Sequence, residues 1–362
     1  MKLSVLDTML LRSDQSSADA IAATVALAQC ADEAGYERYW VSEHHGGPLA
    51  STTPPVAVST IAARTERIRV GSGGVMLPNH TAFDVAEQFS FLEAAYPGRI
   101  DLGLGRAPGG RAIAIYALRD GAAANPASFP HQVESIQAMV QPEGATVHVQ
   151  GSTYTLKATP EARTTPTVWI LGSSTESARL AGERGLPYAY AHHFSGTGTD
   201  EAVDVYRSRF RPSEHAERPR VLLTMNAVIA PTEDDARRLA LPYALALLSM
   251  QTNGSMQRQP LVEDAETQAL SGELKAFSTQ LMAPWVVGTA AQGRAQISAF
   301  ARRHDVDEVM IHPVAGAFTG TAADRSPQRE ATLRLLSVEE GHSSQEVPGE
   351  GASGGSPAVA AR

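Results

Sequence analysis

The segment Tyr39–His45, YWVSEHH, places one carboxyl group and two imidazoles directly after residues that favour a β-strand. Side chains alternate along a strand, so Ser42 and His44 point to one side and Glu43 and His45 to the other. An imidazole titrates near neutral pH and can therefore donate, accept or transfer a proton. Two interpretations stay open from this segment alone. Either one histidine faces an active site at the strand end, or both are surface or supporting histidines.

A second candidate site lies at residues 171–178, LGSSTESA, where a predicted strand ends in glycine and a helix begins. Free N–H groups and the positive end of a helix dipole attract anions, and the hydroxyls of Ser173 and Ser174 add donors. Ordinary helix capping by these serines is the alternative. Arg106 follows the preceding predicted strand, and an arginine beside a helix N-terminus is a good phosphate ligand. We therefore expect a single phosphate to bind here.

The segment GSGG at residues 71–74 contains three glycines where another predicted strand ends. Glycines at the mouth of a barrel would let a flat ring lie directly against the backbone. A flexible turn is the alternative interpretation. The sequence GLGRAPGG at 103–110 does not match a dinucleotide-binding fingerprint, because its third glycine is replaced by Pro108.

The elements that would position these groups alternate as strand, loop and helix. Eight strands followed by helices predict an α/β fold, a (β/α)8 TIM barrel, whose active site forms at the carboxyl ends of the strands. The predicted strands cover residues 2–7, 37–42, 68–71, 99–104, 167–171, 187–191, 220–229 and 307–312.

Two parts of the barrel depart from this rhythm. Insertions are expected after strand 4, over residues 105–130 and 142–163, the second with a β-hairpin at 146–157. A further insertion after strand 7, at 252–283, is polar and irregular and is predicted to be a mobile lid. We expect residues 1–338 to form one domain and residues 339–362, which are rich in Gly, Ser, Pro, Ala and Glu, to form a disordered tail.

Composition excludes several classes of protein. The chain has 362 residues, 43% of them hydrophobic, and a formal net charge of -9, so neither a nucleic-acid nor an anionic membrane partner is expected. No segment approaches the ~20 apolar residues of a membrane span, and no secretory signal is apparent, so a cytoplasmic protein is predicted. The single cysteine, Cys30, allows no intramolecular disulfide.

Other catalytic chemistries fit the sequence poorly. The paired histidines at 44–45 and 192–193 are adjacent, so their rings diverge, and no metal site is expected. Glycoside hydrolysis needs two facing carboxylates, whereas the end of strand 4 offers Arg106 and no acid. A serine hydrolase elbow, G-x-S-x-G between a strand and a helix, does not occur among the predicted strands and helices; the pattern appears once, as GASGG at 351–355 in the predicted tail.

Four motifs together resemble a known family. YWVSEHH, GSGGVMLPNH, GRIDLGLGRAPG and LGSSTESARLAGERGLPYAYAHHF are similar to segments of the bacterial luciferase-like flavin monooxygenases, especially the group often named luciferase family oxidoreductases. The resemblance covers about residues 1–338 in order and spacing. It is specific for the family but not for a substrate.

This resemblance implies a (β/α)8 barrel that binds reduced FMN (FMNH2), supplied by a separate flavin reductase. With O2 the reduced flavin would form a C4a-(hydro)peroxide that oxygenates a small or medium-sized organic substrate by hydroxylation, epoxidation or Baeyer–Villiger insertion. His44 matches the catalytic histidine beside the flavin. The positions that match cofactor-binding residues are Ser72 and Gly73 behind the ring, often at a non-prolyl cis peptide, and Arg106, Ser173, Ser174 and Ser177 at the phosphate. A homodimer formed through the second and third helices is also implied.

The sequence departs from the family pattern at Gly105, where the luciferases proper have a reactive cysteine, so light emission and aldehyde oxidation are not implied. The resemblance leaves two other functions open: a deazaflavin-dependent dehydrogenase of the same superfamily, and a non-catalytic flavin-binding protein. The Ala- and Arg-rich composition resembles that of proteins from high-GC bacteria, in which such enzymes often tailor secondary metabolites.

Overall fold

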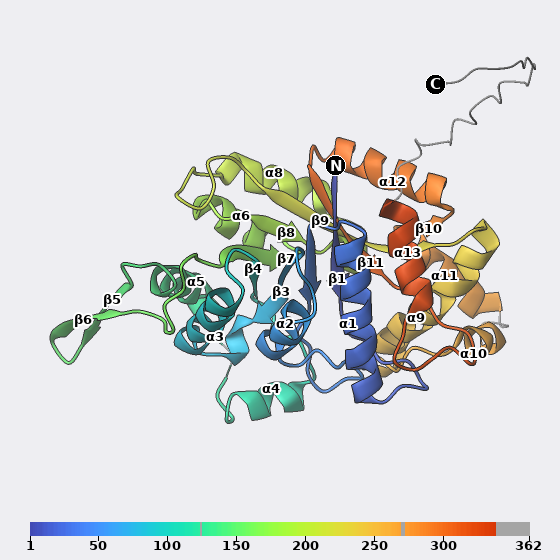
Figure 1. The fold of residues 1–362 in the computed structure, drawn as a ribbon, viewed down its shortest axis with the longest axis horizontal. Helices are drawn as coiled ribbons and strands as arrows, with labels where there is room; N and C mark the ends of the chain where they lie inside the picture. The colour runs from blue at the N-terminus through green and yellow to red at the C-terminus, as the bar shows by residue number, and fades with distance from the viewer. Residues whose placement is uncertain (124, 269–271, 338–362) are drawn as a thin grey trace, which may run out of the picture.

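A computed structural model describes residues 1–337 except 124 and 269–271. Parallel strands form the centre of the molecule, and helices surround them (Figure 1). The sheet contains nine strands, and pairing of β8 with β9 closes eight of them into a barrel, which confirms the predicted fold. The barrel strands are β1 (Lys2–Asp7), β2 (Arg38–Val41), β3 (Arg69–Met76), β4 (Ile100–Gly105), β7 (Thr167–Gly172), β8 (Tyr188–Tyr190), β9 (Val221–Ile229) and β11 (Glu308–Pro313).

The helices connect these strands in the order expected for βα units. They are α1 (Ser17–Glu33), α2 (Pro54–Ala62), α3 (Ala82–Ala95), α4 (Ala112–Leu118), α5 (Phe129–Met139), α6 (Thr175–Glu183), α7 (His192–Ser195), α8 (Thr199–Arg209), α9 (Glu233–Asn253), α10 (Val262–Gln268), α11 (Gly272–Met282), α12 (Ala290–Arg303) and α13 (Pro327–Ser337). Several begin at residues whose side chains cap the first turn. Ser16 and Asp19 form a capping box at α1, and Thr232 caps α9.

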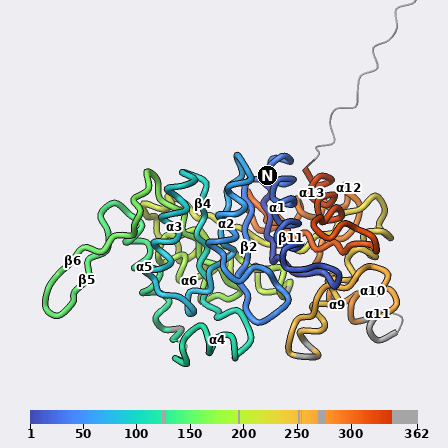
Figure 2. The backbone as a smooth tube through the Cα atoms, turned by 60° about the horizontal axis from the view of Figure 1, so that its bottom comes forward, coloured from blue at the N-terminus to red at the C-terminus, as the bar shows by residue number. Residues whose placement is uncertain are grey.

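The insertions differ in part from the prediction. The hairpin after strand 4 is confirmed as β5 (Ala145–Val149) and β6 (Ser152–Leu156), which extends away from the barrel (Figure 2). The prediction that 252–283 is irregular is wrong, because α9 continues to Asn253 and α10 and α11 follow it. A short strand that we did not predict, β10 (Val286–Gly288), pairs with the end of β9. The predicted tail, 339–362, lies outside the described residues.

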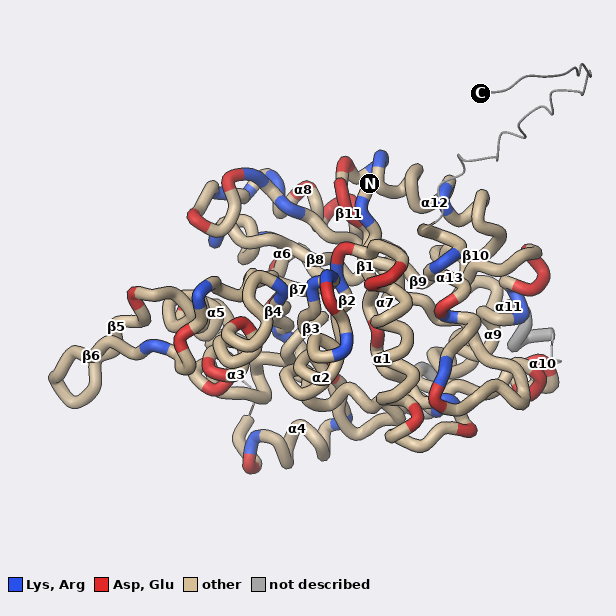
Figure 3. The backbone as a smooth tube through the Cα atoms, in the orientation of Figure 1, with Lys and Arg blue, Asp and Glu red and all other residues tan. Residues whose placement is uncertain are grey.

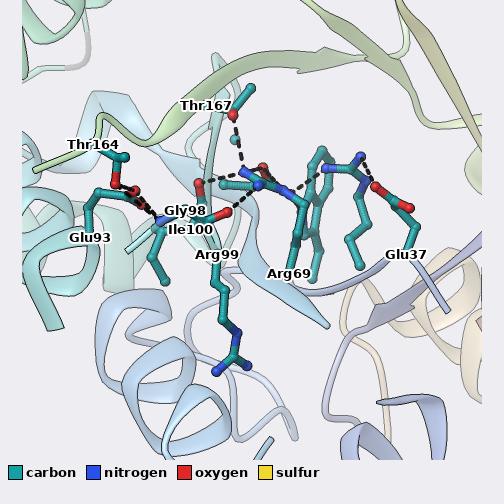
Figure 4. Close-up of polar contacts among 12 residues, drawn as sticks. Glu37, Arg69, Glu93, Gly98, Arg99, Ile100, Thr164 and Thr167 are labelled. Carbon is teal, nitrogen blue, oxygen red and sulfur yellow. Dashed lines mark hydrogen bonds and ion pairs between the residues drawn. The ribbon is translucent and has the colours of Figure 1, made fainter. Parts of the chain in front are cut away.

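The interior of the barrel is closed at the amino ends of the strands by a buried ionic network. Arg38 Nη1 lies 2.5 Å from Asp101 Oδ2, and Arg38 Nε lies 2.6 Å from Glu308 Oε1. Arg69 approaches the other oxygen of Asp101 at 2.7 Å and also donates to the Ile100 carbonyl and the Thr167 hydroxyl (Figure 4). Since burying an unpaired charge is costly, this set of paired charges must remain together in the folded state.

Apolar side chains fill the barrel above this network. Trp40 and Trp169 meet edge to face with ring centroids 5.3 Å apart, and the Trp40 indole donates to Asp101 at 3.0 Å. Leu6 and Met310 belong to the same buried cluster. The amino end of the barrel is therefore packed, and open space is left at the carboxyl ends, as in other barrels of this type.

Asp7, at the end of β1, joins the barrel to the helices around it. Its oxygens accept from the Tyr39 hydroxyl at 2.6 Å, Thr24 Oγ1 at 2.9 Å, Arg329 Nη2 at 2.7 Å and the Met9 amide at 2.8 Å. Burial alone would raise the pKa of Asp7, but Arg329 and the hydroxyl and amide donors lower it to about 2. The carboxylate is thus ionised in the folded protein and holds α1 and α13 against the strands.

Candidate active site

The carboxyl ends of the strands surround a cavity of about 360 Å³. Side chains from almost every barrel strand reach it, together with residues of α9 and the segment that follows. Six of the seven predicted site positions line this cavity: His44, Gly73, Arg106, Ser173, Ser174 and Ser177. The cavity therefore brings together motifs that are far apart in the sequence.

His44 lines the cavity next to Ser42, on the same side of the β2 segment as Trp40. The alternation expected from the sequence is thus observed, since Tyr39 and Val41 pack instead against the helices. Burial, reinforced by the nearby His45, lowers the pKa of His44, while Glu43 opposes this shift. Within the described part of the chain, no group makes a hydrogen bond to the His44 ring. A ligand in the cavity can therefore do so.

Glu43 fixes the backbone around this histidine. Its Oε1 lies 2.7 Å from His45 Nε2 and 2.8 Å from His80 Nε2, and its Oε2 accepts from the Met76 amide at 2.8 Å. Burial would raise the pKa of Glu43, but the bonds from both histidines and from Met76 lower it. A buried carboxylate with three partners is a rigid support, so Glu43 and His45 position the segment that carries His44.

The glycines after β3 lie behind the cavity, where side chains would not fit. A Cβ at Gly73 would approach Leu6 Cδ1 to 2.9 Å, and a Cβ at Gly74 would approach the Gly103 carbonyl oxygen to 2.7 Å. The peptide between Gly73 and Gly74 is cis, next to the predicted position. Ser72 is buried and does not line the cavity, because its hydroxyl donates to the Gly103 carbonyl at 2.9 Å and accepts from the Gly103 amide at 3.0 Å. The Ser72 side chain thus joins β3 to β4.

The serines of the predicted anion site lie at the N-terminus of α6. Ser174 is the N-cap, and its side chain accepts from the Ser177 amide. The Ser177 hydroxyl donates to the Ser174 carbonyl at 2.8 Å, so Ser177 supports the first turn. Ser173 is exposed beside it. Helix capping and cavity lining therefore occur together, and the two interpretations made from the sequence do not exclude each other.

Arg106 completes this end of the cavity. Its guanidinium forms an ion pair with Glu176 in the first turn of α6, and the two side chains are 35% and 60% exposed. The Arg106 bond and charge lower the pKa of Glu176. A guanidinium, free helix amides and serine hydroxyls are the donor set that a phosphate group requires. The side-chain-free surface at Gly73 and this donor set fit a flavin mononucleotide.

Sequence reasoning missed the apolar wall of the cavity. Tyr243, Leu247 and Met250 from α9, with Met256 and Leu281 from the following segment, line it. Met256 lies in the loop between α9 and α10, and the other four lie on helices rather than at strand ends, so no motif marks them. Among residues 1–337 without 124 and 269–271, no group of three or more His, Cys, Asp or Glu side chains could hold a metal ion.

Comparison with known proteins assigns the fold and these motifs to one family. The sequence model described as luciferase-like monooxygenase matches residues 1–307. The chain belongs to the luciferase-like monooxygenase family. A relative in Bacillus subtilis, the uncharacterized protein YwcH, is 39% identical over 86% of this chain and 93% of its own. A luciferase-like monooxygenase of Escherichia coli K12 is 34% identical to this chain, and the match covers 85% of this chain and 90% of the E. coli protein.

A solved structure supports the same assignment. Apo-MsnO8 superposes on this chain with a TM-score of 0.81 at 30% sequence identity, covering 93% of this chain and 97% of MsnO8.

Within the part of the chain that the structure describes, none of the helices is both long and apolar enough to cross a membrane. Positions of Lys and Arg lie interspersed with those of Asp and Glu along the described chain (Figure 3).

Proposed function

We propose that the protein is an FMN-dependent monooxygenase that takes up reduced FMN from a separate flavin reductase and uses O2 to oxygenate a small or medium-sized organic substrate. The observation that carries this proposal is the single cavity that joins Arg106 and the α6 N-terminus to Gly73 and His44. Reduced FMN, when bound, would supply the electrons that activate O2 and allow one oxygen atom to reach the substrate. Tailoring of a secondary metabolite is a role consistent with this chemistry.

The residues of the chain have separate tasks in this proposal. Arg106, Ser173 and Ser174 bind the phosphate, and Gly73 with the backbone beside it supports the ring. His44 is neutral near pH 7, because burial lowers its pKa. It can therefore hold a proton on one ring nitrogen and accept one on the other, next to the reacting atoms.

The nature of the cofactor is the part of the proposal that most needs a test, because proteins with this fold bind different flavins. The oxygenating constituent of 3,6-diketocamphane monooxygenase, at 17% identity and a TM-score of 0.70, was solved with FMN. An F420-dependent secondary alcohol dehydrogenase, at 13% identity and a TM-score of 0.62, was solved with an F420-acetone adduct. Both likenesses concern the fold alone.

The experiment is an anaerobic titration with reduced FMN, and separately with reduced F420, followed by rapid mixing with O2. We expect saturable binding of FMN and a transient absorbance that belongs to neither reduced nor oxidised FMN. The His44→Ala variant should bind FMN within about twofold of the wild type but change the lifetime of that transient. Tighter binding of F420 without oxygen consumption would instead indicate a deazaflavin-dependent dehydrogenase, and FMN binding without any turnover would indicate a flavin-binding protein.

We also propose a homodimer formed through α2 and α3, as the family resemblance implies. Val56 on α2 and Phe91 on α3 are 63% and 57% exposed, and both line a surface groove of about 610 Å³ between the two helices. Large exposed apolar side chains that lie together are typical of protein interfaces. Burial against the same surface of a second copy would remove them from water.

A further inference from the structure

A second wall of the cavity contains polar groups that the proposed function does not use. Thr8 follows β1, His193 lies in α7 after β8, and Thr224 lies on β9; all three line the cavity. His312, at the end of β11, is buried behind them, with its ring centroid 5.6 Å from that of His193. The hydrogen bonds of this wall determine which of its groups can donate to a ligand and which can only accept.

The bonds around Thr224 fix the tautomer of His193. The Thr224 hydroxyl donates its only proton to the Tyr190 carbonyl at 3.1 Å, so the same oxygen can only accept from His193 Nδ1. Nδ1 of His193 must therefore carry the proton, and Nε2 keeps its lone pair. None of the described residues makes a hydrogen bond to Nε2, which is the polar ring atom left for a ligand in the cavity.

A parallel argument fixes Thr8. Asn226 Nδ2 donates to the His193 carbonyl at 3.0 Å, so Asn226 Oδ1 faces His312 Nδ1 at 2.8 Å and accepts from it. His312 Nε2 is then unprotonated and accepts from the Thr8 hydroxyl at 3.2 Å. With its proton given to His312, the Thr8 oxygen offers only lone pairs to the cavity. The wall thus presents two hydrogen-bond acceptors.

The charge of both imidazoles supports this assignment. Burial, reinforced by His192, lowers the pKa of His193 to about 3, and burial likewise lowers the pKa of His312 well below its usual value. Both rings are therefore neutral near pH 7, and His193 Nε2 remains an acceptor there. The hydroxyls of Ser42 and Tyr243, which also line the cavity, can donate as well as accept and do not set a preference.

The rest of the cavity is unsuited to an anionic substrate. Among its described lining residues, Arg106 is the only lysine or arginine, and it is already paired with Glu176 and assigned to the phosphate. Much of the remaining surface is apolar: Leu49, Met76, Leu247, Met250, Met256 and Leu281. A carboxylate on the substrate would lose its water without gaining a cation, which is costly.

We propose that the His193 and Thr8 wall selects a neutral, largely apolar substrate that carries a hydroxyl donor, such as a phenol or an alcohol. This inference rests on the proposed function only in taking the cavity to be the substrate site. His193 acts as the acceptor, and Thr224 is a positioning residue that keeps the His193 proton on Nδ1.

The test is calorimetric binding of three probes to the protein, with and without FMN, at pH 7. The probes are 4-ethylphenol, 4-ethylanisole, which lacks the donor, and 4-ethylbenzoate, which is an anion. We expect 4-ethylphenol to bind about tenfold more tightly than 4-ethylanisole, as one hydrogen bond to a buried acceptor warrants, and 4-ethylbenzoate to bind weakest.

Two variants and one control locate the effect. His193→Phe removes the acceptor and should reduce the phenol preference to about one, and Thr224→Val frees the His193 tautomer and should reduce it as well. The control is His192→Phe, because His192 bonds to Thr199 and does not line the cavity; it should keep the preference. Thr224→Val also provides the answer if His193→Phe does not fold.

Several results would overturn the inference. These are equal affinities of the wild type for 4-ethylphenol and 4-ethylanisole, tighter binding of 4-ethylbenzoate, a preference that survives both variants, or no saturable binding of 4-ethylphenol. Failure of the proposed function is distinguishable, because FMN affinity is measured in the same samples. A protein that does not bind FMN refutes the FMN assignment, while the phenol preference is still measured in the FMN-free protein.

Discussion

Replacing Glu176 with glutamine should tighten the binding of FMN. Glu176 holds the Arg106 guanidinium in an ion pair at the mouth of the proposed phosphate site. A phosphate must share or displace this carboxylate. The Glu176→Gln variant keeps the size and helix position of the side chain but removes its charge, so it isolates the electrostatic competition from the packing.

The magnitude follows from the exposure of the pair. Ion pairs between side chains as exposed as these, 35% and 60%, contribute about 0.2–1 kcal/mol. Removing the Glu176 charge also relieves its repulsion of the phosphate, which amounts to about 1 kcal/mol for unit charges 4 Å apart in water. Together these effects, about 1.2–2 kcal/mol, predict FMN binding that is roughly eight- to thirtyfold tighter. Loss of Arg106 in Arg106→Ala should instead cost about 1.5–3 kcal/mol, because a charged hydrogen bond to phosphate is lost.

The assay is a fluorescence titration with FMN at two salt concentrations, and riboflavin, which lacks the phosphate, is the control ligand. Neither substitution should alter riboflavin affinity, and added salt should shrink the gain in Glu176→Gln. Weaker FMN binding in Glu176→Gln would refute the reasoning, because it would mean that Glu176 orients Arg106 for the phosphate. Equal changes for riboflavin would place the effect away from the phosphate.

Two further predictions concern stability and assembly. The pKa of Asp7 in the folded protein, about 2, lies below its ordinary value of about 3.9. The ionised carboxylate therefore stabilises the folded state by about 2–3 kcal/mol above pH 4, and this stabilisation is lost as the pH falls toward 2. Asp7→Asn leaves the buried Arg329 unpaired and should lower the free energy of unfolding in urea by about 3–5 kcal/mol at pH 7. Below pH 4 the difference in unfolding free energy between wild type and variant should become smaller. A difference that does not change with pH would contradict the role of the charge. Phe91→Glu should convert the dimer to monomers in sedimentation velocity without loss of FMN binding. The control is Phe194→Glu, which replaces an exposed phenylalanine of α7 and should leave the dimer intact. An unchanged dimer in Phe91→Glu would exclude the α2 and α3 surface.

The sequence predicts those parts of the site that depend on local order. Alternation along β2 is sufficient to place His44 toward the cavity, and Ser173, Ser174 and Arg106 are recognisable because they follow strands directly. The helical nature of 252–283 is not recognisable, since short polar helices such as α10 and α11 gain their stability from packing against other elements. Periodicity therefore could not distinguish them from loops.

The acceptor character of His193 could not have been predicted either. It depends on Thr224 and on the Tyr190 carbonyl, which belong to two neighbouring strands, and on the direction in which one hydroxyl proton points. A sequence shows that a histidine is present, but the surrounding hydrogen bonds determine which of its nitrogens carries a proton. The side chain of Ser72 bonds β3 to β4, which the sequence also does not reveal, and the match of Ser72 to the cofactor stays a prediction.

The ionic network of Arg38, Asp101 and Glu308 separates the part of the barrel that maintains the fold from the part that meets ligands. Its charges lie at the amino ends of the strands, with Trp40 and Trp169 between them and the cavity. Substitutions of side chains that face the cavity therefore leave this network untouched. A lineage of such proteins can exchange its substrate-facing side chains and acquire new reactions while the same scaffold continues to fold.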